Sequence, residues 1–249
     1  MKKYLRALPM SFTMFTAVPL PYHRWDDEAR PLMTLFLPVV GAFVGGLWTL
    51  LAFVLRWLSL PALACGAALC AFPFLITGGI HMDGFLDVTD AVRSWRDLEE
   101  RRRILKDPHV GSFAVLFAVL LILAQFALFA CAKETAEPFS LLLIAVVSRT
   151  VAALCVTVLR PMETSEYAGV YRKGIRISHV IVFAALLAAA VALGFVFLGK
   201  YGCCSLAVIA GYLLLLQRAF RSLKGMSGDV SGYAMTFAEF CGIAVYALI

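Results

Sequence analysis

Charged residues are scarce in this sequence. Only 15% of its 249 residues are Asp, Glu, Lys or Arg, and 62% are hydrophobic, whereas soluble domains are about 25% charged and about half apolar. A water-soluble globule is therefore not expected. The apolar residues are spread over the whole length instead of forming one anchor, so the chain must enter lipid repeatedly, as helices or as a closed barrel.

The apolar stretches lack the strict alternation of barrel strands. Several approach or exceed the about 20 residues that one spanning helix needs. We predict an all-α, polytopic transmembrane helical bundle, a single domain over residues 1–249, with about seven spans at 33–57, 62–80, 112–132, 139–159, 178–199, 202–217 and 232–249. The proline-interrupted segment 4–22 is predicted to be an interfacial helix or a partial span. It lacks the clean apolar core of a secretory signal, and we expect it to be retained.

The sequence also shows no cysteine framework. All seven cysteines fall inside or at the ends of the apolar spans, which predicts packing and not disulfides or zinc binding.

Basic residues are nearly absent from one side of the predicted bundle. With a cytoplasmic amino terminus, 18 of the 22 Lys and Arg residues and 13 of the 16 acids fall in cytoplasmic segments. The positive-inside rule therefore predicts a multi-pass protein of the cell (inner) membrane with its polar loops in the cytoplasm. The formal charge of +6 then indicates proximity to anionic lipid and not to nucleic acid.

Three carboxylates share one helical face after the second predicted span. Asp83, Asp87 and Asp90 are spaced i, i+4 and i+7, so on an α-helix they would form one stripe of mutually repelling charges. A divalent cation with oxygen ligands would offset this repulsion, and Mg²⁺ is the natural candidate. The alternative is a solvated acidic face.

Other polar segments add further candidates. Asp107 and His109 follow a basic cluster that would either bind phosphate or only report cytoplasmic topology, and Asp229 lies in a glycine- and serine-rich turn before the last span. The basic candidates for substrate binding are Arg101, Arg102, Arg103, Lys106, Arg172 and Lys173. Within the bilayer, Arg149 and Glu239 should face the bundle interior and would be able to pair.

The motifs resemble the cobalamin synthase family, also called adenosylcobinamide-GDP ribazoletransferase. The resemblance rests on Thr77-Gly-Gly-Ile-His-Met-Asp-Gly-Phe-Leu-Asp-Val-Thr-Asp90, Leu105-Lys-Asp-Pro-His-Val-Gly111 and Ser227-Gly-Asp-Val-Ser-Gly232, followed by Glu239. Ala91 stands where many members have glycine, and Thr236 where many have an acid.

The resemblance implies Mg²⁺-dependent transfer of a phospho-cobinamide group from adenosylcobinamide-GDP to α-ribazole or its 5′-phosphate, with release of GMP. Asp83, Asp87, Asp90 and Asp229 would hold the metal. Asp90, Asp107 or His81 would accept the proton of the attacking hydroxyl. The sequence leaves open whether the chain forms a homo-oligomer.

Two other classes compete with the enzyme. A transporter of a divalent cation or small solute would also use several spans, but its binding groups would be expected near the midplane, often in repeated halves. A scaffold for soluble enzymes would not need an ordered acid triad. The acid stripe also resembles the general arrangement in CDP-alcohol phosphotransferases, whose full spacing is not matched.

Overall fold

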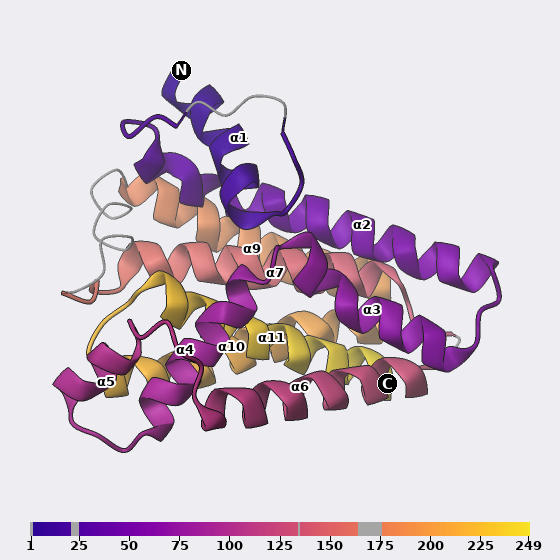
Figure 1. The fold of residues 1–249 in the computed structure, drawn as a ribbon. Coiled ribbons are helices and arrows are strands. Elements are labelled where there is room, and N and C mark those ends of the chain that lie inside the picture. The colour runs from indigo at the N-terminus through magenta and orange to yellow at the C-terminus, as the bar shows by residue number, and fades with distance from the viewer. Residues whose placement is uncertain (1, 21–24, 134, 164–175) are drawn as a thin grey trace.

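The computed structural model describes residues 2–20, 25–133, 135–163 and 176–249. Within these ranges the regular elements are all helices, which confirms the predicted all-α bundle (Figure 1). The elements are α1 (Lys2–Phe15), η1 (Arg30–Phe36), α2 (Leu37–Trp57), α3 (Ala62–Ile76), α4 (Ile80–Arg93), α5 (Leu98–Ile104), α6 (Ser112–Cys131), α7 (Phe139–Val158), α9 (Ile177–Leu198), η2 (Gly199–Gly202), α10 (Cys203–Leu223) and α11 (Gly228–Leu248).

The long apolar helices identify a multi-pass membrane protein. In the described part of the chain, five helical stretches are long and apolar enough to cross a membrane, or six if the bent pair α3 and α4 forms one span. One of these stretches, Ile177–Leu223, contains two of the predicted spans, α9 and α10, separated by η2. The number of seven spans stays a prediction.

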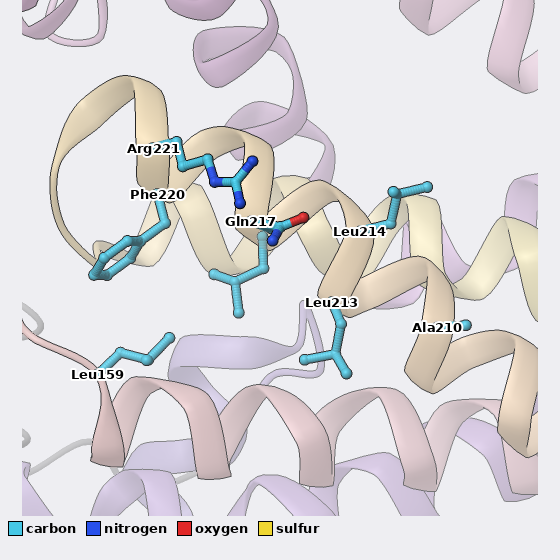
Figure 2. A pocket seen from close by; sticks show the side chains of 8 residues that line it. Leu159, Ala210, Leu213, Leu214, Gln217, Phe220 and Arg221 are labelled. Carbon is cyan, nitrogen blue, oxygen red and sulfur yellow. The ribbon is translucent and has the colours of Figure 1, made fainter.

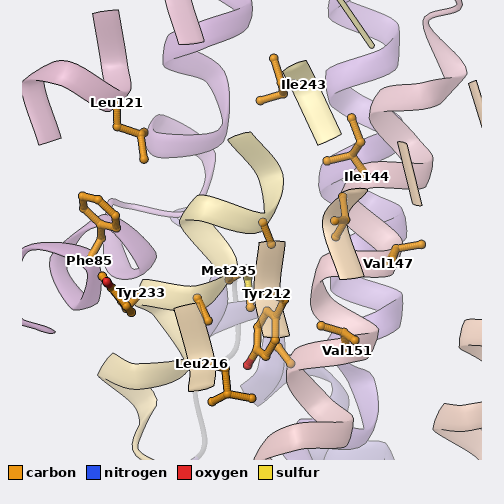
Figure 3. Packing of buried hydrophobic residues seen from close by; sticks show 14 of the residues in the cluster. Phe85, Leu121, Ile144, Val147, Val151, Tyr212, Leu216, Tyr233, Met235 and Ile243 are labelled. Carbon is orange, nitrogen blue, oxygen red and sulfur yellow. The ribbon is translucent and has the colours of Figure 1, made fainter. Parts of the chain in front are cut away.

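Helix α11 runs through the interior of the bundle. It packs against α10, α4, α7 and α6. Figure 3 shows Tyr233 and Met235 of α11 between Phe85 of α4 and Tyr212 of α10, and the rings of Phe85 and Tyr233 stack with centroids 5.5 Å apart. Because large side chains lock α11 against its neighbours, the residues at its amino-terminal end have fixed positions relative to α4.

A sharp bend separates α3 from α4. The predicted span 62–80 is too long, because α3 ends at Ile76 and the axes of α3 and α4 differ by 88°. Gly78 and Gly79 allow this turn with φ of +63° and +77°, values that glycine adopts without the steric penalty of a Cβ atom. The bend makes α4 a separate helix, and the predicted stripe of three aspartates lies on it.

The amino-terminal segment forms α1, whose 14 residues are fewer than the about 20 that a span requires. Helix α1 packs on η1 and α2. The guanidinium of Arg6 donates to Asp26 at 2.7 Å, and the backbone N–H of Ala17 donates to the carbonyl of Ile76 at 2.8 Å. The chain after α1 is thus attached at the α3–α4 bend.

The two ends of the bundle gather different segments. At one end, Lys133 and Lys200 donate to the backbone oxygen of Ile249 at 2.9 and 2.6 Å. The opposite end, here called the α5 end, holds α5 and the turn 224–227 (Figure 1). This grouping matches the predicted sidedness of the loops, while the orientation in the membrane stays a prediction.

The cysteines form no disulfide in the structure, as predicted, and two of them are buried in the core. All seven are free thiols. Cys70 and Cys204 are buried, Cys70 in the contact between α3 and α6 and Cys204 in the core beneath η2, where small apolar thiols fill space well.

Candidate active site

The acid stripe of α4 lies at the α5 end of the bundle. Asp83 is in the first turn of α4 and is exposed, whereas Asp87 and Asp90 are half-buried. The other face of α4 carries the apolar residues Phe85, Val88 and Val92, which are buried in the core. The packing of that apolar face therefore decides where the three carboxylates point.

Asp229 joins the stripe because α4 and α11 approach each other at glycines. A Cβ atom added to Gly84 would lie 2.8 Å from the carbonyl oxygen of Asp229, and one added to Gly232 would lie 3.2 Å from the carbonyl oxygen of His81. The hydroxyl of Thr236 also donates to the His81 carbonyl at 3.0 Å. Because no side chains separate the two backbones at these glycines, α4 and α11 approach closely, and Asp229 comes near the acids of α4.

The four carboxylates have no counter-charge of their own among the described residues. Asp83, Asp87, Asp90 and Asp229 form no ion pair with a described Lys, Arg or His. The charges of Asp83, Asp90 and Asp229 all act on Asp87. A cluster of like charges without a compensating cation is destabilised by repulsion, which is the condition that a bound cation relieves.

The donor set suits Mg²⁺ better than a cation that demands a complete protein cage. In the described ranges, no three His, Cys, Asp or Glu residues are close enough together to hold a metal ion by themselves. Mg²⁺ is commonly bound through one or two carboxylates, with waters and substrate phosphates as the remaining ligands. One or two of Asp83, Asp87 and Asp229, together with water and substrate phosphate, would suffice for such a site.

Asp90 has a different environment from its neighbours on the stripe. One carboxylate oxygen accepts the N–H of Gly111 at 2.6 Å, and the other accepts the N–H of Ala114 at 2.8 Å. These are donors at the start of α6 that the helix itself cannot satisfy. Asp90 thus caps α6 from another helix and fixes α6 against α4.

Asp107 and His109 contact each other in the loop between α5 and α6. The carboxylate of Asp107 accepts the backbone N–H of His109 at 2.9 Å and lies 2.7 Å from its ring Nδ1. The backbone and side-chain hydrogen bonds from His109 lower the pKa of Asp107 below its ordinary value. A carboxylate with a lowered pKa is a weaker proton acceptor, which disfavours Asp107 as a general base.

The predicted arginine cluster is largely occupied by contacts within the protein. Arg101 donates to the carbonyl of Ser222 at 3.4 Å, and Arg102 donates to the carbonyl of Leu223 at 3.2 Å. These carbonyls end α10, where cationic donors are favourable. Arg103 pairs with Glu100 at 2.6 Å, and Lys106 is exposed. The predicted substrate-binding residues Arg172 and Lys173 lie outside the described residues.

A cavity of about 160 Å³ lies beside the acids. His81, Asp83, Asp229 and Ser231 form its polar wall. Met14 and Phe15 of α1 also line it, which gives the amino-terminal helix a place at the site that the sequence did not predict.

A wider groove of about 580 Å³ lies elsewhere, along the outer face of α10. Figure 2 shows Leu213, Leu214, Gln217, Phe220 and Arg221 of α10 around it, with Leu159 facing them. No described Asp or Glu lines this groove. Its size alone does not make it the reaction site, because the carboxylates lie on α4 and at the start of α11.

Comparison with known proteins supports the family resemblance that the three motifs indicated. Residues 7–247 match the family model of cobalamin-5-phosphate synthase. The chain is 34% identical over 251 residues to an adenosylcobinamide-GDP ribazoletransferase of Clostridium perfringens, with 100% of both chains covered. Relatives of the same name are 32% identical over 245 residues in Clostridium botulinum (98% of this chain, 97% of the relative) and 26% identical over 251 residues in Lachnoclostridium phytofermentans (98% and 94%).

The chain belongs to the cobalamin-5-phosphate synthase family. It is therefore an enzyme of cobalamin synthesis, which confirms the resemblance. No solved structure matches the chain.

A buried ion pair lies deeper in this synthase. The guanidinium Nη1 of Arg149 contacts Oε1 of Glu239, and the hydroxyl of Ser148 donates to the same oxygen at 2.9 Å, which confirms the expected pairing. Arg149 is only 1% exposed, and its Nε and Nη2 atoms have no hydrogen-bond partner among the described residues. Glu239 holds α11 to α7 through this pair.

Three features of the site were missed in the sequence. The role of Gly84 depends on which helix crosses α4, the cap formed by Asp90 depends on where α6 begins, and Phe15 reaches the site only through the docking of α1. Glycines within both acidic motifs were the available signal for close helix contact, because glycine lets backbones approach.

Proposed function

We propose that this synthase transfers the phospho-cobinamide group of adenosylcobinamide-GDP to α-ribazole or α-ribazole 5′-phosphate, giving adenosylcobalamin or its 5′-phosphate and GMP. The names of the relatives support the substrates. The observation that carries the reaction class is the cluster of carboxylates without a counter-charge, assembled where Gly84 meets Asp229. Phosphoryl transfer depends chiefly on positioning and on neutralisation of charge.

Asp83, Asp87 and Asp229 would hold Mg²⁺. When bound, the ion would neutralise the charge on the pyrophosphate and on the departing GMP. The two aspartates of α4 are one helical turn apart and Asp229 comes from α11, so the carboxylates that would hold the ion come from two helices. The close packing at Gly84 fixes the backbone of the two helices that carry these carboxylates, which limits the reorganisation needed when substrate arrives.

His81 stays beside Asp90 and Asp107 as a candidate to accept the proton of the attacking ribose hydroxyl, because it lines the cavity together with Asp83 and Asp229. Asp90 is engaged by two backbone donors and serves as a positioning residue that holds α6 and α4 together. Asp107 is a weaker proton acceptor because of its contacts with His109.

The reaction takes place at the cytoplasmic face of the inner membrane in this proposal. The acids lie at the α5 end, together with the basic loops that the positive-inside rule places in the cytoplasm. The side chain of Lys106 is exposed, and we propose that it contacts a phosphate group of the substrate.

The deciding experiment is an assay of GMP release and cobalamin formation by the full chain in liposomes. Adenosylcobinamide-GDP and α-ribazole are supplied with Mg²⁺, with EDTA, and with either substrate omitted. We expect GMP and cobalamin in equal amounts only when both substrates and Mg²⁺ are present. Absence of product from protein that is folded, as judged by a single gel-filtration peak and helical circular dichroism, would contradict the proposal.

A further inference from the structure

The cavity beside the acids has two chemically different walls. Its polar residues serve the proposed reaction, but a second part of its lining, here called the apolar wall, comes from four helices: Met14 and Phe15 of α1, Leu37 of α2, Val156 of α7 and Met235 of α11. The proposed phosphoryl transfer gives this apolar wall no role.

The apolar wall is built into the fold. Phe15 is 6% exposed and Val156 is 2% exposed. Phe15 and Leu37 belong to a compact cluster of buried residues with Val40, Val44, Ala153 and Phe183. The hydrogen bond from Ala17 to Ile76 holds the end of α1 over the cavity, so the wall is in place before any ligand binds.

Size and polarity restrict what this wall can contact. A cavity on the order of 150 Å³ accommodates one benzene ring, so the about 160 Å³ here is far too small for a corrinoid. A guanine base carries polar groups around most of its edge, and those that face the methyl and thioether groups of the apolar wall would be buried without partners, which is unfavourable. A flat base with an apolar outer edge gives up no hydrogen bonds to water when that edge contacts the apolar wall.

We infer that this cavity is the acceptor subsite and that its apolar wall receives the methylated benzene edge of the base of α-ribazole. The inference rests on the proposed function. With this edge between Phe15 and Val156, the ribose leaves the cavity on the side of Asp83, Asp229 and His81. The structure thus assigns α1 to the selection of the acceptor base, whereas the donor phosphates meet the acids from outside.

Two variants change the apolar wall in opposite directions. Val156→Phe narrows the cavity, and Phe15→Ala widens it. Phe12→Ala is the matched control, because Phe12 lies on the same helix and packs against Phe43 with centroids 5.3 Å apart but does not line the cavity. The full chain in liposomes is assayed with α-ribazole and with the riboside of unmethylated benzimidazole, and KM is measured separately for donor and acceptor.

We expect Val156→Phe to raise the KM for α-ribazole about tenfold or more, as misfit of a few atoms in an apolar pocket does, with the KM for adenosylcobinamide-GDP within twofold of the parent. Phe15→Ala should lower the preference for α-ribazole over the unmethylated riboside about tenfold. Phe12→Ala should change neither ratio.

Unchanged acceptor KM and unchanged preference in these variants would overturn the inference, and so would an equal rise in the KM for the donor. If Val156→Phe does not fold, the preference of Phe15→Ala decides alone. A parent protein that makes no cobalamin would instead refute the proposed function, so the two failures are distinguishable.

Discussion

Helix α11 carries two acids in opposite situations. Asp229, in its first turn, lies beside Asp83 and Asp87 without an ion-pair partner among the described residues, whereas Glu239 is paired with Arg149 and accepts a hydrogen bond from Ser148. The two positions are about 15 Å apart along the helix. One charge is compensated inside the protein, and the other is left for a ligand.

The paired acid, Glu239, stabilises the fold, whereas the unpaired acid, Asp229, is available for the reaction. The Arg149–Glu239 pair neutralises itself in a region where unpaired charge is strongly unfavourable, and it ties α7 to α11. The acids at α4 and Asp229 keep their oxygens available at the end of the bundle. Substitutions at the pair should therefore act on folding, and those at the open acids on turnover.

The largest effect is expected at the buried pair. Arg149→Met leaves Glu239 buried without its cation, which should lower the free energy of unfolding by about 3–5 kcal/mol. Urea unfolding in detergent, followed by circular dichroism, measures this change. The double variant Arg149→Met with Glu239→Gln removes both charges and should recover most of the loss. Equal destabilisation of the single and double variants would show that packing, and not charge, is what the pair contributes.

Removal of one open acid should affect turnover instead. Asp87→Asn keeps the size of the side chain but removes a charge at the centre of the cluster, so we expect kcat to fall about 100-fold or more, as for the loss of one electrostatic contact to the transition state. The same unfolding assay should show unchanged or higher stability because repulsion is reduced. Parent-like turnover would remove Asp87 from the metal site.

A substitution at the contact between Gly84 and Asp229 should lower both stability and turnover. A Cβ atom in Gly84→Ala would meet the Asp229 backbone at 2.8 Å, and such overpacking typically costs about 1–3 kcal/mol. We also expect lower kcat because Asp229 is displaced. Gly46→Ala is the control, since nothing lies within 4 Å of its added Cβ atom and alanine favours the helix. If both variants lose activity equally, helix flexibility and not the α4–α11 contact is responsible.

The smallest effect is expected at Asp107. Its pKa is lowered by the hydrogen bonds from His109, so the carboxylate stays ionised throughout the neutral range and its contribution is lost only as the pH falls through that lowered value. Asp107→Asn should therefore leave the pH profile of kcat between about pH 6 and about pH 8 unchanged. Loss of the acidic limb of the profile would instead restore Asp107 as the proton acceptor.

The sequence predicted the parts of the structure that depend on local pattern. Apolar runs located the long helices, the i, i+4, i+7 spacing placed three aspartates on one face of α4, and the scarcity of intramembrane charge indicated the pairing of Arg149 with Glu239. These inferences needed only helical periodicity and the unfavourable solvation of charge in lipid.

Other parts depended on contacts between distant segments. The end of α3 at Ile76 was not predicted, because the apolar pattern continues to Ile80 while the left-handed turn at Gly78 and Gly79 redirects the chain. Arg101 and Arg102 were assigned to substrate as basic loop residues, yet they donate to carbonyls at the end of α10. Which partner a polar side chain meets is fixed by helix packing, and that information is distributed over the whole chain.

The dependence of the site on α11 sets an order for its formation during biosynthesis. The chain emerges from the ribosome beginning at its amino terminus, so α1, α4 and the apolar wall contributed by Phe15 are made well before Asp229. Until α11 is inserted beside Gly84, the acids of α4 lack their partner and the cavity lacks the wall formed by Ser231 and Met235. A nascent or truncated chain therefore contains no assembled site, and the capacity to handle activated phosphate arises only with the last described helix in the membrane.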